Sequence, residues 1–339
     1  MADFHPLRVA AVDRLTDDAV AVTFEVPAEL AADYVFHAGQ HLTLRPWFDD
    51  QEVRRTYSVC SPVGGALRVG IKRSGLMSTW LCDDLEVGDE LDVLPPLGSF
   101  GPREALQGKR FGLIAAGSGI TPLLSVAATA LAEGAEVLLL YGNRTSRGAM
   151  LVDEVADLKD VHPERFQVVH VLSGEQQGSD LVTGRLEGDR LRRLVDAFGQ
   201  GVDAWYLCGP FGLVEGARKV LADAGATSVH VELFHPEGQP PRPVVQPPEG
   251  TELTAVLGGR TTSTHLSPGE TVLDGVLRVR ADAPYACRGG VCGTCRARLV
   301  EGEVQMDVNY ALEPEELEAG VVLTCQSRPT TESVRVEYL

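Results

Sequence analysis

Four cysteines in the last quarter of the chain have a spacing typical of an iron–sulfur centre. Cys287, Cys292 and Cys295 form the pattern Cys-x4-Cys-x2-Cys, and Cys325 follows after 29 intervening residues. This is the plant-type 2Fe–2S spacing, in which four thiolates converge on two bridged irons. The glycines within the pattern let a short loop curl around the irons and point its N–H groups at the sulfurs.

Other uses of these cysteines are less consistent with the pattern. A structural zinc site usually combines two Cys-x-x-Cys or Cys/His pairs, and this region has only one Cys-x-x-Cys. Rieske ligation needs two histidines beside the cysteines, and the nearest, His265, is too far along the chain. A disulfide framework is disfavoured because the total of seven cysteines is odd and no export signal is evident.

A second motif, Arg55-Thr56-Tyr57-Ser58, suits a flavin. An arginine can pair with a phosphate, a tyrosine can stack on the isoalloxazine ring, and a serine can hydrogen-bond to its polar atoms. Gly75-Leu76-Met77-Ser78 opens a short helix expected over residues 78–83, and its N–H groups suit a pyrophosphate. Four residues alone are a weak pattern, so an exposed strand end is the alternative.

A third motif, Gly-Ser-Gly-Ile-Thr-Pro at residues 117–122, lies between an expected strand and an expected helix. Its glycines allow a diphosphate to approach the helix N-terminus closely. Thr121 is expected to cap the helix, and Pro122 suits its first turn. The alternative is a strand–helix turn without a ligand.

Two further loops extend this nucleotide site. Arg144 follows the second strand of the segment, where NAD sites often carry an acidic residue, and an arginine there suits a 2′-phosphate. A solvated loop arginine is the alternative. Cys208-Gly209-Pro210 follows a later strand, so its thiol belongs either beside a nicotinamide ring or in the core.

The elements that position these motifs predict a multidomain protein. Residues 1–105 alternate apolar and polar in short runs separated by turns, which predicts an antiparallel β-barrel or sandwich. In residues 106–235, strands alternate with helices near 122–133, 150–159, 187–196 and 211–224, which predicts an α/β domain with a parallel sheet. Residues 236–249 are a proline-rich linker, and residues 250–339 form a small α+β unit.

Composition limits the classes of partner. The chain has 339 residues and a formal net charge of −18, so a nucleic-acid binder is not expected. Residues 111–132 carry no charge, but the Gly/Pro-containing turn divides them, and we expect no membrane span. The first residues lack a basic segment followed by an apolar run, so we expect a cytoplasmic protein.

These motifs in this order resemble the ferredoxin–NADP reductase superfamily with a plant-type ferredoxin domain of β-grasp fold fused at the C-terminus. The resemblance covers essentially the whole chain. It extends to Val231-Glu232-Leu233-Phe234 and to the stretch 309–317, Asn-Tyr-Ala-Leu-Glu-Pro-Glu-Glu-Leu. These features are similar to the reductase components of oxygenases that act on an aromatic CoA thioester.

The resemblance implies a role for individual residues. FAD contacts are expected at Arg55, Tyr57, Ser58, Gly75, Met77 and Ser78. Nicotinamide contacts are expected at Gly117, Thr121, Cys208, Gly209 and Pro210. Phe234 matches the aromatic that covers the flavin, so Ser58, Cys208 and Phe234 are the expected reaction centre. NADP-specific relatives often carry Ser-Arg where this chain has Ser173-Gly174, so a preference for NADPH over NADH depends on Arg144.

The implied function is electron transfer from NADPH, or NADH, through FAD and a 2Fe–2S cluster to a di-iron oxygenase. No expected helix carries the Glu-x-x-His pattern of a di-iron site, so oxygen chemistry belongs to another chain. Acidic residues of the ferredoxin segment provide either a docking surface or a plain solvated one; they are Glu301, Glu303, Glu313, Glu315, Glu316 and Glu318. The alternatives are a reductase for a steroid, aromatic or alkane hydroxylase, a ferredoxin-like carrier without NAD(P)H activity, and a zinc-binding interaction module.

Overall fold

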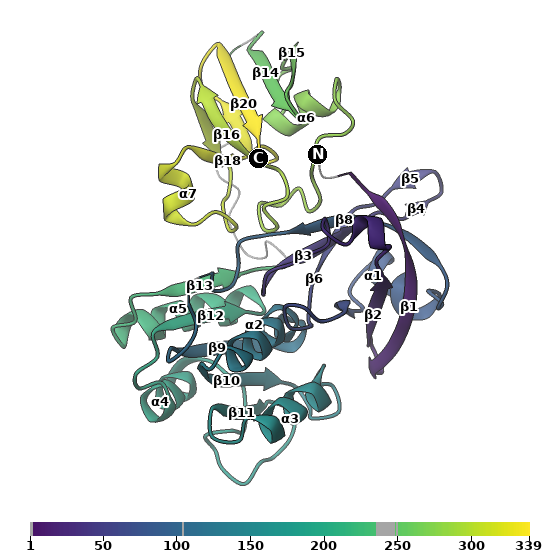
Figure 1. The fold of residues 1–339 in the computed structure, drawn as a ribbon. Helices are drawn as coiled ribbons and strands as arrows, with labels where there is room; N and C mark the ends of the chain where they lie inside the picture. Colours follow the sequence, from purple (N-terminus) through teal and green to yellow (C-terminus); the bar gives the residue numbers. More distant parts are fainter. Residues whose placement is uncertain (1–2, 104, 235–247, 249) are drawn as a thin grey trace. The chain divides into compact units, whose positions relative to one another are not determined.

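The computed structural model describes residues 3–103, 105–234, 248 and 250–339 (Figure 1). By its internal contacts the chain divides into two compact units, one over Phe4–Glu232 and one containing Leu233–Leu339. The expected linker over 236–249 lies outside the described residues, apart from Pro248. Each unit is described by itself below.

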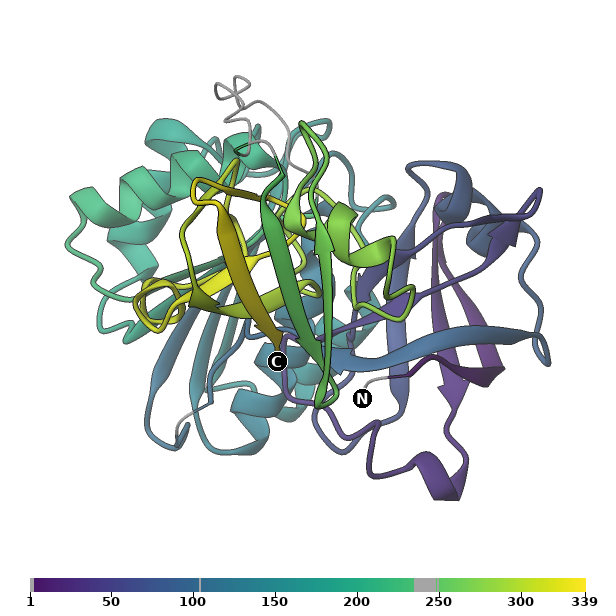
Figure 2. The same cartoon turned by 90° about the horizontal axis from the view of Figure 1, so that it is seen from above.

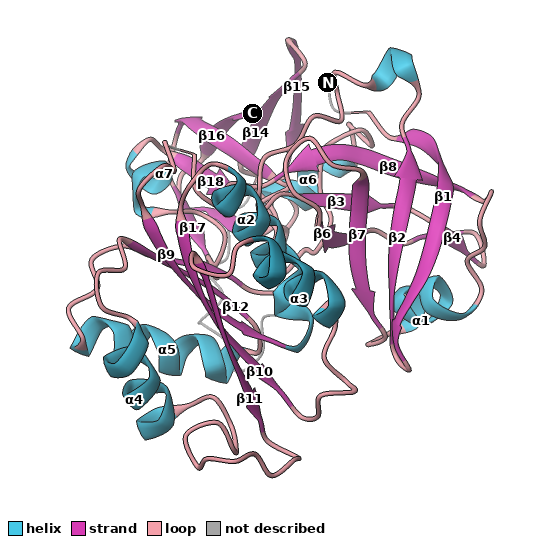
Figure 3. Cartoon of the chain, turned by 60° about the horizontal axis from the view of Figure 1, so that its bottom comes forward, coloured by secondary structure: helices cyan, strands magenta, loops and turns pink. Residues whose placement is uncertain are grey.

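The first part of unit Phe4–Glu232 is a six-stranded antiparallel sheet, as the alternating pattern predicts (Figure 3). Its strand order is β6-β3-β8-β1-β2-β7. The strands are β1 (His5–Thr16), β2 (Ala19–Glu25), β3 (His41–Leu44), β6 (Arg55–Ser58), β7 (Leu67–Lys72) and β8 (Glu90–Leu97). Helix α1 (Leu76–Asp83) begins two residues before the predicted start. The short elements η1 (Ala28–Leu30), β4 (Trp47–Phe48) and β5 (Gln51–Glu52) complete this part. Inward side chains of this sheet and of α1 form one apolar core.

The second part of this unit is the predicted parallel sheet, with strand order β11-β10-β9-β12-β13. Its strands are β9 (Arg110–Ala116), β10 (Glu136–Asn143), β11 (Phe166–Leu172), β12 (Ala204–Cys208) and β13 (Val229–Glu232). The helices that alternate with them are α2 (Ile120–Ala132), α3 (Val152–Val161), α4 (Gly188–Phe198) and α5 (Phe211–Asp223). Figure 3 shows these helices lying over the sheet. Every strand pairs in parallel because each crossover contains a helix.

The uncharged run 111–132 forms strand β9, a 3-10 turn η2 (Gly117–Gly119) and helix α2. Helix α2 is buried on nearly every side, which explains its continuous apolar sequence. Among the described helices, none is both long and apolar enough to cross a lipid bilayer.

Unit Leu233–Leu339 is the predicted α+β unit (Figure 2). Its main sheet has strand order β15-β14-β20-β16-β18, in which β14 and β20 are parallel and the other pairs antiparallel. The sheet strands are β14 (Glu252–Leu257), β15 (Arg260–His265), β16 (Arg296–Glu301), β18 (Val321–Leu323) and β20 (Ser333–Tyr338). Helix α6 (Val272–Leu277) adds its apolar side chains to the core, and α7 (Pro314–Glu318), β17 (Val304–Met306) and β19 (Ser327–Pro329) complete the unit.

Candidate functional site

Strand β6 presents the Arg-Thr-Tyr-Ser motif at the edge of the antiparallel sheet, paired with β3. Arg55 is exposed, Tyr57 is half-buried and Ser58 is buried. Burial raises the pKa of Tyr57, so its hydroxyl stays protonated at neutral pH. The Ser58 Oγ donates a hydrogen bond to Glu232 Oε2 at 3.2 Å, across 174 residues of sequence. The end of β6 therefore meets the end of β13.

Glu232 is a functional candidate that the sequence analysis did not select. It is the last residue of β13 and pairs with Cys208, the last residue of β12. Although part of the Glu232 residue reaches the surface, desolvation raises the pKa of its carboxyl to about 8, against the lowering effect of the Ser58 hydrogen bond. A carboxylate inside the apolar run Val-Glu-Leu-Phe was the signal that could have identified it.

Cys208 is fully buried, and burial, followed by the nearby Glu232 carboxyl, raises its pKa well above the ordinary thiol value. The structure thus brings the predicted residues Ser58 and Cys208 together around one carboxyl group. At neutral pH, all three groups hold their protons.

The start of α1 is closed by its own side chain. The Ser78 hydroxyl accepts hydrogen bonds from the N–H groups of Ser74 at 2.8 Å and Gly75 at 2.9 Å. Ser78 therefore shapes the turn. The Met77 side chain is buried in the barrel core, so its expected FAD contact stays a prediction for its backbone N–H.

The glycine-rich turn after β9 differs in one detail from the expectation. Thr121 is not the helix cap, because α2 begins one residue earlier, at Ile120, with Gly119 in the cap position. The Thr121 hydroxyl instead donates to the Ser118 carbonyl at 3.0 Å. A Cβ atom on Gly119 would lie 2.1 Å from the Cys208 carbonyl oxygen, so only glycine allows these two turns to touch.

A cavity of about 650 Å³ opens at the carboxyl ends of these parallel strands, where α/β folds bind ligands. It is lined by four predicted residues, Gly117, Arg144, Ser173 and Pro210. Thr121, Cys208 and Gly209 do not line it. Four charged residues that the sequence analysis did not select also line it, namely Asp18, Lys72, Arg185 and Glu187. Loop arginines carry no periodic signal, so Arg185 could be found only from the fold.

The close approach of Arg144 to residue 174 explains why that residue is a glycine. A Cβ atom on Gly174 would lie 2.8 Å from the Arg144 carbonyl oxygen and 3.1 Å from its Cγ. The Gly174 N–H also donates to that carbonyl at 2.6 Å. A side chain at residue 174 would therefore have to displace Arg144, so glycine is the residue that fits beside it.

The four C-terminal cysteines lie as two pairs. The Cys287 and Cys292 thiols shift each other's pKa, as do the Cys295 and Cys325 thiols, so the members of each pair are neighbours. Within the described ranges, no three His, Cys, Asp or Glu side chains surround a single ion position. Two thiol pairs suit two irons better than one zinc ion.

The loop around these cysteines has the donors and the space that a cluster needs. The Gly289 N–H donates to Cys287 Sγ at 3.3 Å. Contact with the Cys292 thiol, followed by backbone N–H groups, lowers the pKa of Cys287. Gly290 has φ +75°, and a Cβ atom there would lie 2.9 Å from a methyl group of Val308. The donor set and the glycine fit a 2Fe–2S centre.

Phe234, the third member of the expected reaction centre, belongs to the other compact unit. It is half-buried there. Its expected place over the flavin stays a prediction.

Three family models match successive parts of the chain. An oxidoreductase FAD-binding domain matches residues 6–101, an oxidoreductase NAD-binding domain matches residues 113–219, and a 2Fe–2S iron–sulfur cluster binding domain matches residues 256–330.

Curated relatives match along the whole chain. One subunit of the 1,2-phenylacetyl-CoA epoxidase of Escherichia coli (strain K12) is 41% identical over 100% of this chain and 98% of that protein. The ferredoxin reductase component of 3-ketosteroid-9-alpha-monooxygenase from Mycobacterium tuberculosis (strain CDC 1551 / Oshkosh) is 37% identical over 98% of this chain and 95% of that protein.

Solved structures share the architecture. Phthalate dioxygenase reductase, a modular structure for electron transfer from pyridine nucleotides to 2Fe–2S, matches with a TM-score of 0.61 and 25% identity over 99% of this chain and 98% of that one. An intact type IV self-sufficient cytochrome P450 monooxygenase matches with a TM-score of 0.72 and 23% identity. The match covers 98% of this chain and 41% of the monooxygenase chain. This chain belongs to the ferredoxin–NADP reductase superfamily, in the branch with a fused 2Fe–2S domain, and is an NAD(P)H-dependent oxidoreductase that passes electrons through FAD to a 2Fe–2S cluster.

Proposed function

We propose that this chain is the reductase component of a phenylacetyl-CoA epoxidase and delivers electrons to a di-iron oxygenase partner. The observation that carries the proposal is 41% identity along the whole chain to one subunit of that enzyme, across all three cofactor domains. The described helices carry no Glu-x-x-His pair, so a di-iron centre belongs to a partner. The cytoplasm is its proposed location, because its seven cysteines are free and cluster assembly needs thiols.

A second candidate is a steroid oxygenase reductase, because the ketosteroid monooxygenase component is 37% identical over nearly the same length. The two relatives differ little in identity. Purified oxygenase partners therefore have to decide between them.

At the flavin end, Arg55 would bind a phosphate of FAD, Tyr57 would pack on the isoalloxazine ring, and Ser58 would hydrogen-bond to the polar edge of that ring. FAD, when bound, takes up the hydride and passes electrons on singly. Glu232, through Ser58, holds a proton beside this edge at neutral pH, because burial raises the pKa of its carboxyl to about 8. A neutral carboxyl leaves no negative charge to oppose the arrival of electrons.

At the nucleotide end, the cavity of the parallel sheet binds NADPH. Gly117 and Pro210 line the cavity, and the lack of a side chain on Gly117 allows the close approach of the nucleotide. The positive charge of Lys72 is balanced by Asp18 at 3.4 Å, so Arg144 and Arg185 supply the positive charge that a 2′-phosphate requires, and they outnumber the one remaining carboxylate of the lining, Glu187. This arrangement favours NADPH over NADH.

In the ferredoxin unit, Cys287, Cys292, Cys295 and Cys325 would hold the 2Fe–2S cluster, which would supply one-electron transfer. Exposed carboxylates on the same unit, at Glu301, Glu303, Glu315 and Glu318, attract a basic docking face on the oxygenase. Glu316 contributes less, because it pairs with Arg296 at 3.4 Å.

The test is an anaerobic titration of the holoprotein with NADPH and, separately, NADH, followed by reconstitution with two purified oxygenases. We expect NADPH to bleach the flavin and iron–sulfur absorption. Epoxide should form from phenylacetyl-CoA only when the phenylacetyl-CoA oxygenase is added. Faster electron delivery to the steroid oxygenase would make the second candidate correct. Epoxide formation by this chain alone would contradict the division of labour.

A further inference from the structure

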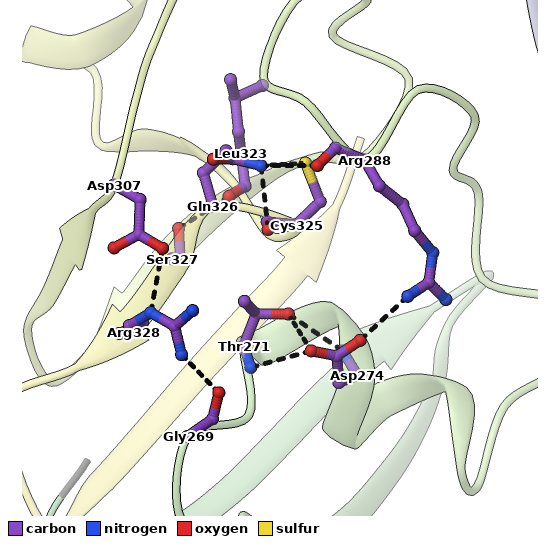
Figure 4. Close-up of polar contacts among 10 residues, drawn as sticks. All are labelled: Gly269, Thr271, Asp274, Arg288, Asp307, Leu323, Cys325, Gln326, Ser327 and Arg328. Carbon is purple, nitrogen blue, oxygen red and sulfur yellow. Dashed lines mark hydrogen bonds and ion pairs between the residues drawn. The ribbon is translucent and has the colours of Figure 1, made fainter. Parts of the chain in front are cut away.

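The side chain of Gln326 lies between Cys325 and the backbone of Arg288 (Figure 4). Its Nε2 is 2.8 Å from the Arg288 carbonyl oxygen, 3.1 Å from the Cys325 carbonyl oxygen and 3.3 Å from Cys325 Sγ. An amide nitrogen has two hydrogens to donate. One therefore serves the Arg288 carbonyl, and the other serves the backbone oxygen and sulfur of Cys325.

The backbone of Gln326 is held by hydrogen bonds at both its N–H and its carbonyl group, which fixes where the side chain begins. The Gln326 N–H donates to the Leu323 carbonyl at 2.9 Å, and its carbonyl accepts from the Asp307 N–H at 2.9 Å. The residue is 8% exposed. A Cβ atom on Gly290 would lie 3.1 Å from Gln326 Cγ, so a glycine of the cysteine loop leaves the space that the Gln326 stem fills.

Arg288, whose carbonyl accepts the other Gln326 hydrogen bond, is also held in place. Arg288 has a left-handed backbone with φ +51°, a conformation that costs energy for a non-glycine residue. Its guanidinium pairs with Asp274 at 3.0 Å and lies 4.8 Å from the centre of the Tyr285 ring. Asp274 is itself bonded to Thr271 at the start of α6. The carbonyl of Arg288 therefore stays directed at Gln326.

A donor aimed at a ligand sulfur changes the reduction potential of an iron–sulfur cluster. When one electron enters the cluster, negative charge on the ligand sulfurs increases, and an N–H donor stabilises that charge. We infer that Gln326 is a positioning residue that raises the reduction potential of the 2Fe–2S cluster by donating a hydrogen bond to Cys325 Sγ, while tying Cys325 to the loop at Arg288.

The inference deepens the proposed function and rests on Cys325 being a cluster ligand. The experiment compares the holoprotein with Gln326→Met, which keeps the length of the side chain and removes the donor. Gln305→Met on β17 is the matched control, since no hydrogen bond among the described residues joins the Gln305 side chain to a cysteine. The readouts are the midpoint potential from an EPR-monitored redox titration, the EPR line shape, and iron and sulfide content.

We expect Gln326→Met to lower the ratio of reduced to oxidised cluster roughly tenfold at a fixed potential, which equals about 59 mV for a one-electron couple. Gln305→Met keeps the wild-type potential. An unchanged potential in Gln326→Met with full cluster content overturns the inference and leaves Gln326 a purely structural tie. An equal fall in Gln305→Met overturns it too, because the effect is then unspecific.

A second variant covers the case in which Gln326→Met assembles too little cluster to titrate. Gln326→Glu keeps the shape of the amide but replaces the donor by a carboxylate oxygen, and it lowers the potential further. A potential equal to or above that of the wild type contradicts the inference. Absence of iron and sulfide from the wild-type protein would instead refute the proposed cluster, so the two failures are distinguishable.

Discussion

At the contact between Ser58 and Glu232, burial keeps protons on acidic groups, whereas at Cys287 hydrogen bonds favour loss of the thiol proton. The effect is confined to one member of the pair Cys287 and Cys292, because contact with Cys287, followed by desolvation, raises the pKa of Cys292. Desolvation raises the pKa of Glu232 to about 8, and it raises that of Cys208 as well. At Cys287, the Cys292 thiol and backbone N–H groups outweigh desolvation and lower the pKa. A centre that accepts hydride has to manage charge and protons, while a cluster needs only thiolates. The same kind of burial therefore serves two chemistries, and the local supply of donors decides which.

The strongest way to separate the two regions is to remove a thiolate. Cys292→Ser is expected to abolish the cluster, because three ligands and a hydroxyl do not hold two bridged irons. Iron and sulfide content should fall to background. FAD content should persist, as should the NADPH-driven reduction of a dye that takes electrons directly from the flavin.

Cys82→Ser is the matched control, since Cys82 is a buried cysteine in the barrel core, far from the cysteine loop in sequence. It should keep full iron and sulfide content. Wild-type iron in Cys292→Ser would remove that residue from the ligand set.

How much of this could be predicted from sequence differs between the two regions. The cysteine spacing predicts the ligand set because one short loop supplies three of the four thiols. The antiparallel and parallel sheets also follow from hydrophobic alternation and from the order of strands and helices. Glu232 and Arg185 were missed because their roles arise from neighbours distant in sequence, Ser58 in one case and Arg144 in the other. The cap at Thr121 was wrong because a 3-10 turn over Gly117–Gly119 starts the helix earlier.

Substitutions in the nucleotide cavity test whether positive charge determines which nucleotide the protein prefers. Arg144→Ala is expected to raise the KM for NADPH roughly tenfold or more, because a charge-assisted hydrogen bond to a phosphate contributes about 1.5–3 kcal/mol. The KM for NADH should hardly change, since NADH has no 2′-phosphate. Arg185→Ala is expected to act in the same direction.

Arg193→Ala on α4 is the control, because this exposed arginine does not line the cavity. Steady-state kinetics with both nucleotides decide the matter. An equal loss for NADH and NADPH would mean that the arginines act on parts shared by both nucleotides.

The proton side of the comparison is tested by Glu232→Gln. Below pH 8 the wild-type carboxyl is neutral, and above pH 8 it becomes a carboxylate beside the proposed flavin edge. Wild-type flavin reduction should therefore slow several-fold as pH rises through about 8, because negative charge opposes electron arrival. The glutamine variant stays neutral, so its rate should be independent of pH over this range.

Stopped-flow reduction of the flavin by NADPH from mildly acidic to mildly alkaline pH gives the two profiles. Cys208 does not account for the transition, because its pKa lies well above the ordinary thiol value. If the fall near pH 8 survives in Glu232→Gln, another group carries it.

The same carboxyl makes a prediction for stability. Its pKa is raised from an ordinary value of 4.5 to about 8 in the folded protein, so the folded state binds more protons than the unfolded state between these values. The contribution of Glu232 to stability is therefore greatest below pH 4.5 and is lost as pH rises toward 8. Urea unfolding should show a steeper decline over this range in the wild type than in Glu232→Gln.

The smallest expected effect concerns the two ion pairs by which Arg68 of strand β7 contacts helix α3 and strand β1. Arg68 Nη1 lies 2.8 Å from Glu154 Oε1, and the two side chains are 19% and 32% exposed. The same guanidinium lies 3.3 Å from Asp13, whose side chain is 54% exposed. Glu154→Gln is expected to lower the free energy of unfolding by about 1 kcal/mol, and Asp13→Asn by less than about 0.5 kcal/mol, because solvent screens the more exposed pair. Urea unfolding of both variants, with Arg68→Met to close a double-mutant cycle, measures the coupling. A larger loss of unfolding free energy in Asp13→Asn than in Glu154→Gln would show that solvent exposure does not determine which of these two ion pairs contributes more to stability.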